Sequence, residues 1–161
     1  MKSASIRELK KELRDRPAEE VMDMCLRLCR FKKENKELMS YLLFESHDEE
    51  AYVQSVKEEI DHRFGQVNRK SPYFIRKSFR SILQHTRKFI RYSSSKETEV
   101  ELLIHYCRRL KEFRPDIRRH SRLLKIHQTL MQQLETKISA LHEDLHYDYF
   151  KELKELGLSE A

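Results

Sequence analysis

The chain has 161 residues, of which 37% are charged and 39% hydrophobic, with a net charge of +6 and only 2 glycines and 3 prolines. So few turn formers exclude a fold of many short strands or a glycine-rich phosphate loop, and they favour one all-α domain over residues 1–161. The longest apolar run, Tyr41 to Phe44, is too short for a membrane span or a secretion signal. We therefore expect a cytoplasmic protein without membrane contacts.

Helical hairpins are predicted over residues 1–70, where apolar residues recur with a spacing near 3.6. A short helix precedes Pro17, and Asn35 is predicted to cap the third helix. A capping box from Ser46 to Glu49 opens the fourth. The second helix is predicted to place one broad apolar side against the core, made of Val21, Met22, Met24, Cys25, Leu26, Leu28 and Phe31.

A basic helix pair is predicted over residues 71–113, followed by one long C-terminal helix over residues 115–157. The helix before Phe113 is apolar over roughly 200° of its wheel, which places it at the centre of the fold. The long helix is expected to bend or break between His142 and Tyr149, because as one straight helix it would exceed the width of the domain. A heptad seam along it is a possible homodimer interface, through Leu124, Met131, Ile138 and Leu145.

About seven helices joined by short links predict antiparallel neighbours. Two arrangements fit this pattern: stacked αα-hairpins in a superhelix like those of HEAT and TPR proteins, or an irregular bundle. The first forty or so residues, with a segment from Ile6 to Leu13, a second from Pro17 to Leu28 and a third from Asn35 to Leu42, resemble a bacterial family of small all-helical proteins of unknown function. The resemblance implies an αα stack and a bacterial origin, and it carries over no catalytic residue.

Positive charge is concentrated in the middle of the chain. Between His62 and Lys96 there are ten Lys or Arg and no Asp or Glu, and eight more lie between Arg108 and Lys125. One interpretation is that carboxylates from the two ends pair with these cations. Another is that arginines of neighbouring helices gather on one outward face and bind an anionic partner. The candidate anion-binding residues are Arg76, Arg80, Arg87, Arg91, Arg118, Arg119 and Arg122.

The segment from His142 to His146 matches H-E-x-x-H, which on a helix places two imidazoles on one side for Zn²⁺. Glu152 is the candidate third ligand. Tyr149 stands where the longer zinc-protease pattern has glycine, however, and Asp144 places a charge where those enzymes have an uncharged residue. We interpret these histidines as surface residues and expect no metal or other cofactor.

These patterns favour a non-enzymatic helical scaffold or adaptor that binds a protein partner, and an acidic protein is one candidate for that partner. The main alternative is a nucleic-acid-binding accessory protein that uses the same arginine surface. A zinc-dependent hydrolase is the third and most distant hypothesis. Both the adaptor hypothesis and the nucleic-acid hypothesis require arginines that converge on one surface and are not neutralised by carboxylates. The distribution of charge on the structure therefore distinguishes them from a surface that is only solvated.

Overall fold

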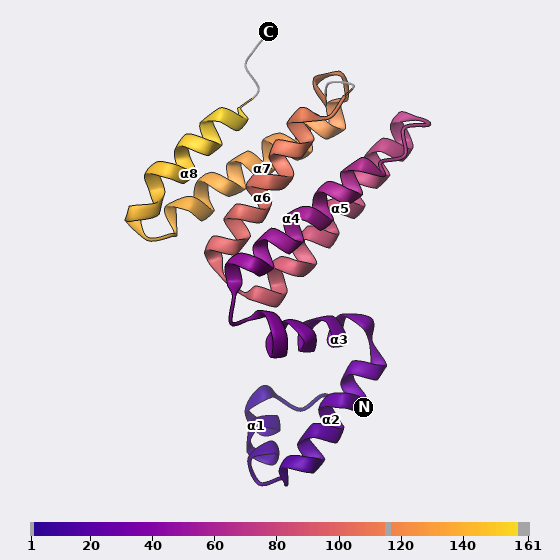
Figure 1. The fold of residues 1–161 in the computed structure, drawn as a ribbon, viewed down its shortest axis with the longest axis vertical. Coiled ribbons are helices and arrows are strands. Elements are labelled where there is room, and N and C mark those ends of the chain that lie inside the picture. The colour runs from indigo at the N-terminus through magenta and orange to yellow at the C-terminus, as the bar shows by residue number, and fades with distance from the viewer. Residues whose placement is uncertain (1, 115–116, 158–161) are drawn as a thin grey trace. The chain divides into compact units, whose positions relative to one another are not determined.

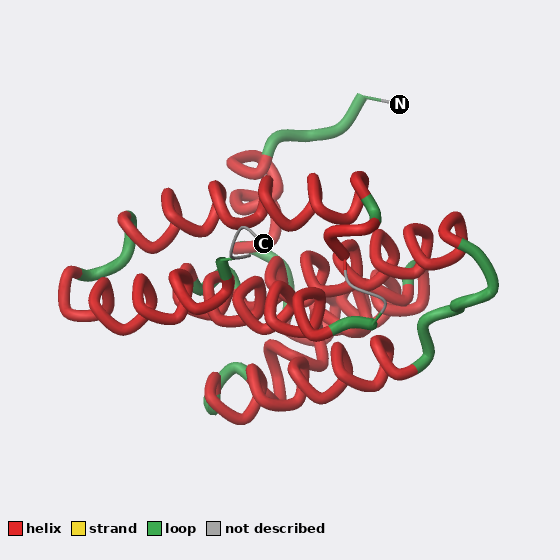
Figure 2. The backbone as a smooth tube through the Cα atoms, turned by 90° about the horizontal axis from the view of Figure 1, so that it is seen from above, coloured by secondary structure: helices red, strands yellow, loops and turns green. Residues whose placement is uncertain are grey.

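All regular structure is helical in the computed structural model, which describes residues 2–114 and 117–157. The all-α prediction is thus confirmed, and Figures 1 and 2 show helices joined mostly by short loops. The chain divides into two compact units, Met1–Phe44 and Glu45–Ala161. Within the described ranges no helix is long and apolar enough to cross a membrane.

The first unit contains three helices with little buried surface. A capping box begins the first, because Ser5 Oγ accepts from the backbone N–H of Glu8 and the Glu8 carboxylate accepts from that of Ser5. The predicted cap at Asn35 is wrong: the third helix begins earlier, and the Asn35 amide donates instead to the Leu28 carbonyl at 2.8 Å. The elements are α1 (Ile6–Arg14), α2 (Ala18–Phe31), α3 (Lys33–Ser40) and the π-helical turn η1 (Tyr41–Glu45).

The second unit is built around one central helix. Side-chain oxygens of Asp48, Ser71 and Ser95 cap its first three helices by accepting backbone N–H groups. The third of these, α6, packs against all four other long helices of the unit, as its wide apolar surface predicts. The elements are α4 (Glu49–Gly65), α5 (Pro72–Ser93), α6 (Lys96–Glu112), the 3₁₀ turn η2 (Ile117–Arg119), α7 (Ser121–Ser139) and α8 (Glu143–Leu156).

The core of this unit is aromatic on the α4–α5 side of α6. The Phe79 ring lies 5.3 Å from that of Phe64 and 4.8 Å from that of Phe113, between ring centroids. Tyr106 of α6 is fully buried, and its hydroxyl donates to the Phe79 carbonyl at 3.0 Å. Burial also raises the pKa of the adjacent Cys107 thiol to about 12, so this thiol is inert. Interlocking rings of this kind hold α4, α5 and α6 in a fixed arrangement.

The prediction of one long C-terminal helix over residues 115–157 is wrong, whereas the bend or break expected within it is present. The described part of this segment is the turn η2 followed by two helices, and the break falls at Ala140–His142, at the start of the expected interval. Because α7 and α8 lie side by side, each packs against α6 as well as against the other (Figure 1), whereas an unbroken helix would leave one half without a partner. Pro115, predicted to open this segment, lies outside the described residues.

Candidate functional site

A groove runs between α5 and α7, the two helices that flank one side of α6. Its deeper part has a volume of about 700 Å³. An adjoining part of about 560 Å³ shares Arg87 with it and reaches α6. We call the two parts together the basic groove; its charged lining residues are Arg80, Arg87, Arg91, Arg122, Lys125, Lys137 and Glu99.

Helical spacing aligns the cations on the α5 wall. Arg80, Arg87 and Arg91 are separated by seven and four residues, so their side chains leave α5 within about 40° of one another. The row extends over roughly 16 Å at 1.5 Å per residue. On the opposite wall, Arg122 and Lys125 lie three residues apart in the first turns of α7. The two walls therefore present these five cations to one concavity, and Lys137 near the end of α7 is a sixth.

The floor of this groove is aliphatic. Leu83 of α5 and Leu130 of α7 line it and are 8% and 1% exposed, and half-buried Ile126 lies beside them. Ile90 and Leu103 line the adjoining part. Among the residues that the structure describes, no aromatic side chain lines either part. A ligand that fits here needs apolar groups along its centre and negative charge along its edges.

Five of the six lining cations are not neutralised by described residues. Within residues 2–114 and 117–157, no carboxylate lies within ion-pair distance of Arg80, Arg87, Arg91, Arg122 or Lys125. The groove's one acidic lining residue, Glu99, is occupied by Lys137 of α7 at 2.7 Å. The concavity thus carries a strong positive field.

Four of the seven arginines proposed from the sequence line this groove: Arg80, Arg87, Arg91 and Arg122. Arg76 is on the same strip of α5 but one turn before the groove begins, and Arg118 and Arg119 are exposed in η2. Lys125 was missed, although its position three residues after Arg122 places it on the same side of α7. Phe79 and Tyr92 of α5 are buried and do not line the groove.

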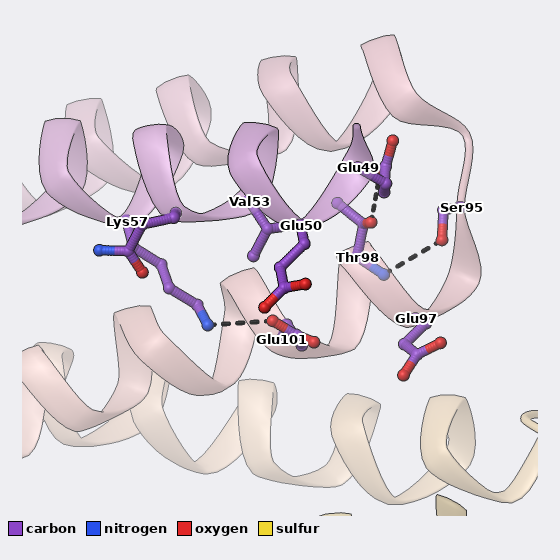
Figure 3. A pocket seen from close by; sticks show the side chains of 9 residues that line it. Glu49, Glu50, Val53, Lys57, Ser95, Glu97, Thr98 and Glu101 are labelled. Carbon is purple, nitrogen blue, oxygen red and sulfur yellow. Dashed lines mark hydrogen bonds and ion pairs between the residues drawn. The ribbon is translucent and has the colours of Figure 1, made fainter. Parts of the chain in front are cut away.

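The opposite side of α6 carries the carboxylates. A groove of about 490 Å³ between α4 and α6 is lined by acidic residues, and Figure 3 shows Glu50, Glu97 and Glu101 around it. It continues toward α8, where Asp148 and Glu152 line a further 380 Å³. We call these two parts the acidic groove. Its α6 residues are separated from those of the basic groove by about 180° around the helix.

Most carboxylates of the acidic groove already have partners. Glu101 accepts from Lys57 Nζ at 2.9 Å, and Glu152 accepts from Arg108 at 2.8 Å. Glu49 accepts from the hydroxyls of Thr98 and Ser93, which joins the start of α4 to the α5–α6 loop. Arg108 of α6 is therefore paired with a carboxylate from the C-terminal part of the chain, as one of the two interpretations predicts. That interpretation does not hold for the five open cations of the basic groove.

Tyr149 fastens α8 to this acidic side. Its hydroxyl donates to Glu97 at 3.0 Å and to Glu101 at 3.3 Å. Burial, followed by the charge of Glu101, raises the pKa of Tyr149, so the phenol remains a neutral donor.

We expect Tyr149→Phe to lower the free energy of unfolding by about 1–2 kcal/mol, because two carboxylates lose a donor. Urea unfolding measures this change, with Tyr147→Phe on the exposed side of α8 as the control; equal stability of the two variants contradicts it.

The H-E-x-x-H residues are placed in other roles. His142 is the N-cap of α8, where its Nδ1 accepts from the backbone N–H of Asp144. His146 Nε2 donates to the Leu141 carbonyl at 3.0 Å, and Glu152 pairs with Arg108. Among the described residues no three His, Cys, Asp or Glu side chains are grouped in a way that could hold a metal ion.

The predicted dimer seam on α7 lies partly inside the core. Ile138 is fully buried, while Leu124, Met131 and Leu145 are half-buried. The side chains that α7 buries most completely follow a neighbouring strip, which includes Leu123, Leu130 and Leu134. Part of the seam is thus used within the chain, and a homodimer through the rest of it stays a prediction.

Comparison with family models, with curated proteins and with solved structures finds no match for this chain. The resemblance of the first forty residues to a bacterial family therefore stays a prediction. A functional proposal must rest on the groove itself, namely on its unneutralised cations, its aliphatic floor and its shape.

Proposed function

We propose that the protein is a non-enzymatic adaptor whose basic groove binds an acidic amphipathic helix of a partner protein. The observation that carries this proposal is the combination of an aliphatic floor with walls of cations that have no carboxylate partners among the described residues. A helix laid between α5 and α7 buries its apolar side on Leu83 and Leu130 and directs its carboxylates to both walls. Apolar burial supplies affinity, and the charges fix orientation.

The spacing of the α5 cations specifies the partner further. The sequence intervals between Arg80, Arg87 and Arg91 are seven and four residues. Side chains at the same intervals on another α-helix also lie on one strip of that helix. A partner helix of about three turns, with Glu or Asp at a matching spacing beside a Leu-rich strip, places one carboxylate near each guanidinium.

Nucleic acid is the alternative that uses the same cations, and the lining of the groove favours it less. Proteins that bind single strands stack bases on aromatic side chains, and none of the described residues that line the basic groove is aromatic. Aliphatic side chains at the floor match the apolar side of a helix better than they match a phosphate backbone.

Binding of defined probes tests the proposal. The probes are a helical peptide of about 20 residues with Leu on one strip and Glu beside it, the same peptide with Lys for Glu, and a uridine RNA of about 20 nucleotides. Fluorescence anisotropy should show that the Glu peptide binds more tightly than the other two and that its affinity falls as salt rises.

Charge reversal locates the binding site. We expect Arg87→Glu to weaken the Glu peptide at least tenfold, about 1.4 kcal/mol, because Arg87 lines both parts of the groove. The matched control is Lys151→Glu, which changes the net charge equally at an exposed residue of α8. Equal weakening by both variants, or tighter binding of the RNA than of the Glu peptide, overturns the proposal.

A further inference from the structure

The unit Met1–Phe44 has a large apolar surface that it does not cover itself. From residue 2 to residue 40 no side chain is buried. Eleven large apolar side chains of this unit are 40–80% exposed. Their exposed area is on the order of 1,000 Å², which exceeds the roughly 800 Å² that each partner contributes to a stable interface.

The apolar strip of α1 and one part of the broader apolar surface of α2 form two seams with complementary spacing. On α1, Ile6, Leu9 and Leu13 follow each other at three and four residues, and the other six residues of the helix are charged. A strip this narrow is typical of a helix that pairs with one other helix, as in a coiled coil. On α2, Met24, Leu28 and Phe31 follow each other at four and three residues, which is the same spacing read in the opposite direction.

Charge agrees with an antiparallel pairing of these seams. In that register Leu13 meets Met24 and Ile6 meets Phe31, so the C-terminal half of α1 lies beside the first turns of α2. The C-terminal half of α1 contains Lys10, Lys11 and Arg14, and the first turns of α2 contain Glu19, Glu20 and Asp23. The cations of one helix therefore face the carboxylates of the other.

The two seams are not paired within the chain. Packing of α2 is against α3, and α1 makes at most marginal contact with α2. Phe31 is 78% exposed and Ile6 80%. The link between the two helices is only Asp15–Pro17, and Arg16 within it is tied to Glu20 by an ion pair at 3.1 Å. Short links that keep complementary helices apart favour exchange of an element between copies.

We propose that two copies of this chain form a dimer in which α1 of each copy packs antiparallel on the α2 seam of the other. The contact is made twice under twofold symmetry and covers the exposed apolar seams of both copies. A lipid surface suits these helices less well: Met22 and Leu26 are also exposed, about 170° around α2 from the Met24–Phe31 seam, and a flat bilayer meets a helix from one side. The inference is independent of the basic groove.

Mixing two broken variants tests the exchange directly. Leu9→Glu disrupts the α1 seam and Leu28→Glu disrupts the α2 seam, and neither residue belongs to the core of the second unit. Sedimentation should show the full chain, of 19.7 kDa, as a dimer at micromolar concentration, and each variant alone as a monomer with a dissociation constant at least tenfold higher. An equimolar mixture should dimerise again, because one α1 and one α2 seam remain intact across the mixed pair.

Tyr147→Glu removes an exposed aromatic side chain outside this unit and should leave the dimer unchanged. The proposal is overturned if the full chain is monomeric at about 100 μM, or if the mixture of variants stays monomeric, which is the result of pairing like seams. It is also overturned if the full chain binds phosphatidylserine vesicles and Leu28→Glu abolishes that binding without any change in oligomeric state.

Discussion

Phe79→Ala should lower the free energy of unfolding by about 3–5 kcal/mol, the largest loss expected from a single substitution outside the N-terminal unit. Phe79 is fully buried, and its ring contacts those of Phe64 and Phe113, so truncation removes aromatic contacts from three elements at once. The surrounding helices are fixed by their own packing and cannot collapse to fill the space.

Urea unfolding followed by far-UV circular dichroism measures this loss. Phe74→Ala is the matched control, since Phe74 lies on the same helix and is 39% exposed. We expect the control to lose less than about 1 kcal/mol. A Phe79→Ala variant as stable as the control contradicts the described core.

The second large effect is acid destabilisation through His127. This residue of α7 is 2% exposed. Burial, and next the charge of Lys111, lowers its pKa, against a smaller opposing effect of a hydrogen bond to the backbone of Leu156. The folded state therefore holds the imidazole neutral. In the unfolded state the ordinary pKa near 6.5 applies, so below that pH the unfolded chain binds more protons than the folded one.

The contribution of neutral His127 to the free energy of unfolding is therefore fully present above pH 6.5. It is lost as pH falls from there toward the lowered pKa of the folded state. We expect the free energy of unfolding to fall between pH 7.5 and pH 5, and to fall less steeply in His127→Leu. His47→Gln, at an exposed histidine, is the control and should keep the slope of the unchanged protein. The slope is obtained from urea unfolding at a series of pH values, and an identical slope in His127→Leu refutes the assignment.

Sequence patterns predict the elements of this fold better than their junctions. The broad apolar surface of α6 predicts its central place because a helix that is apolar on most sides must be covered on most sides. The length of the last segment predicts a bend or break near His142, but the position of the break at Ala140–His142 is harder to predict, because the apolar spacing continues across it. It depends on the packing of both α7 and α8 against α6, which is a tertiary effect.

The same limit applies to the basic groove. Helical spacing places Arg80, Arg87 and Arg91 on one strip of α5, but it does not say which helix forms the opposite wall. Pairs such as Lys57 with Glu101, 44 residues apart, depend on the packing of α4 on α6 and leave no local pattern. Sequence alone therefore could not decide which cations are neutralised and which stay open.

The N-terminal unit shows what periodicity cannot specify. Met24, Leu28 and Phe31 have the spacing of a buried strip, and we expected them to lie against the core of the domain. They are exposed instead. Periodicity identifies a surface that favours burial, but it carries no information about whether the covering surface belongs to the same chain or to another.

The segregation of cations and carboxylates to opposite sides of α6 gives the second unit a transverse electric dipole. In the field of the acidic helix that we propose as the partner, the protein experiences a torque that turns its positive side toward that helix before any contact forms. On this proposal the encounter rate depends strongly on ionic strength, whereas the residence time depends mainly on contacts with the aliphatic floor of the groove and varies less with salt. On this proposal, the association rate and the residence time of the partner are set by different features of the groove.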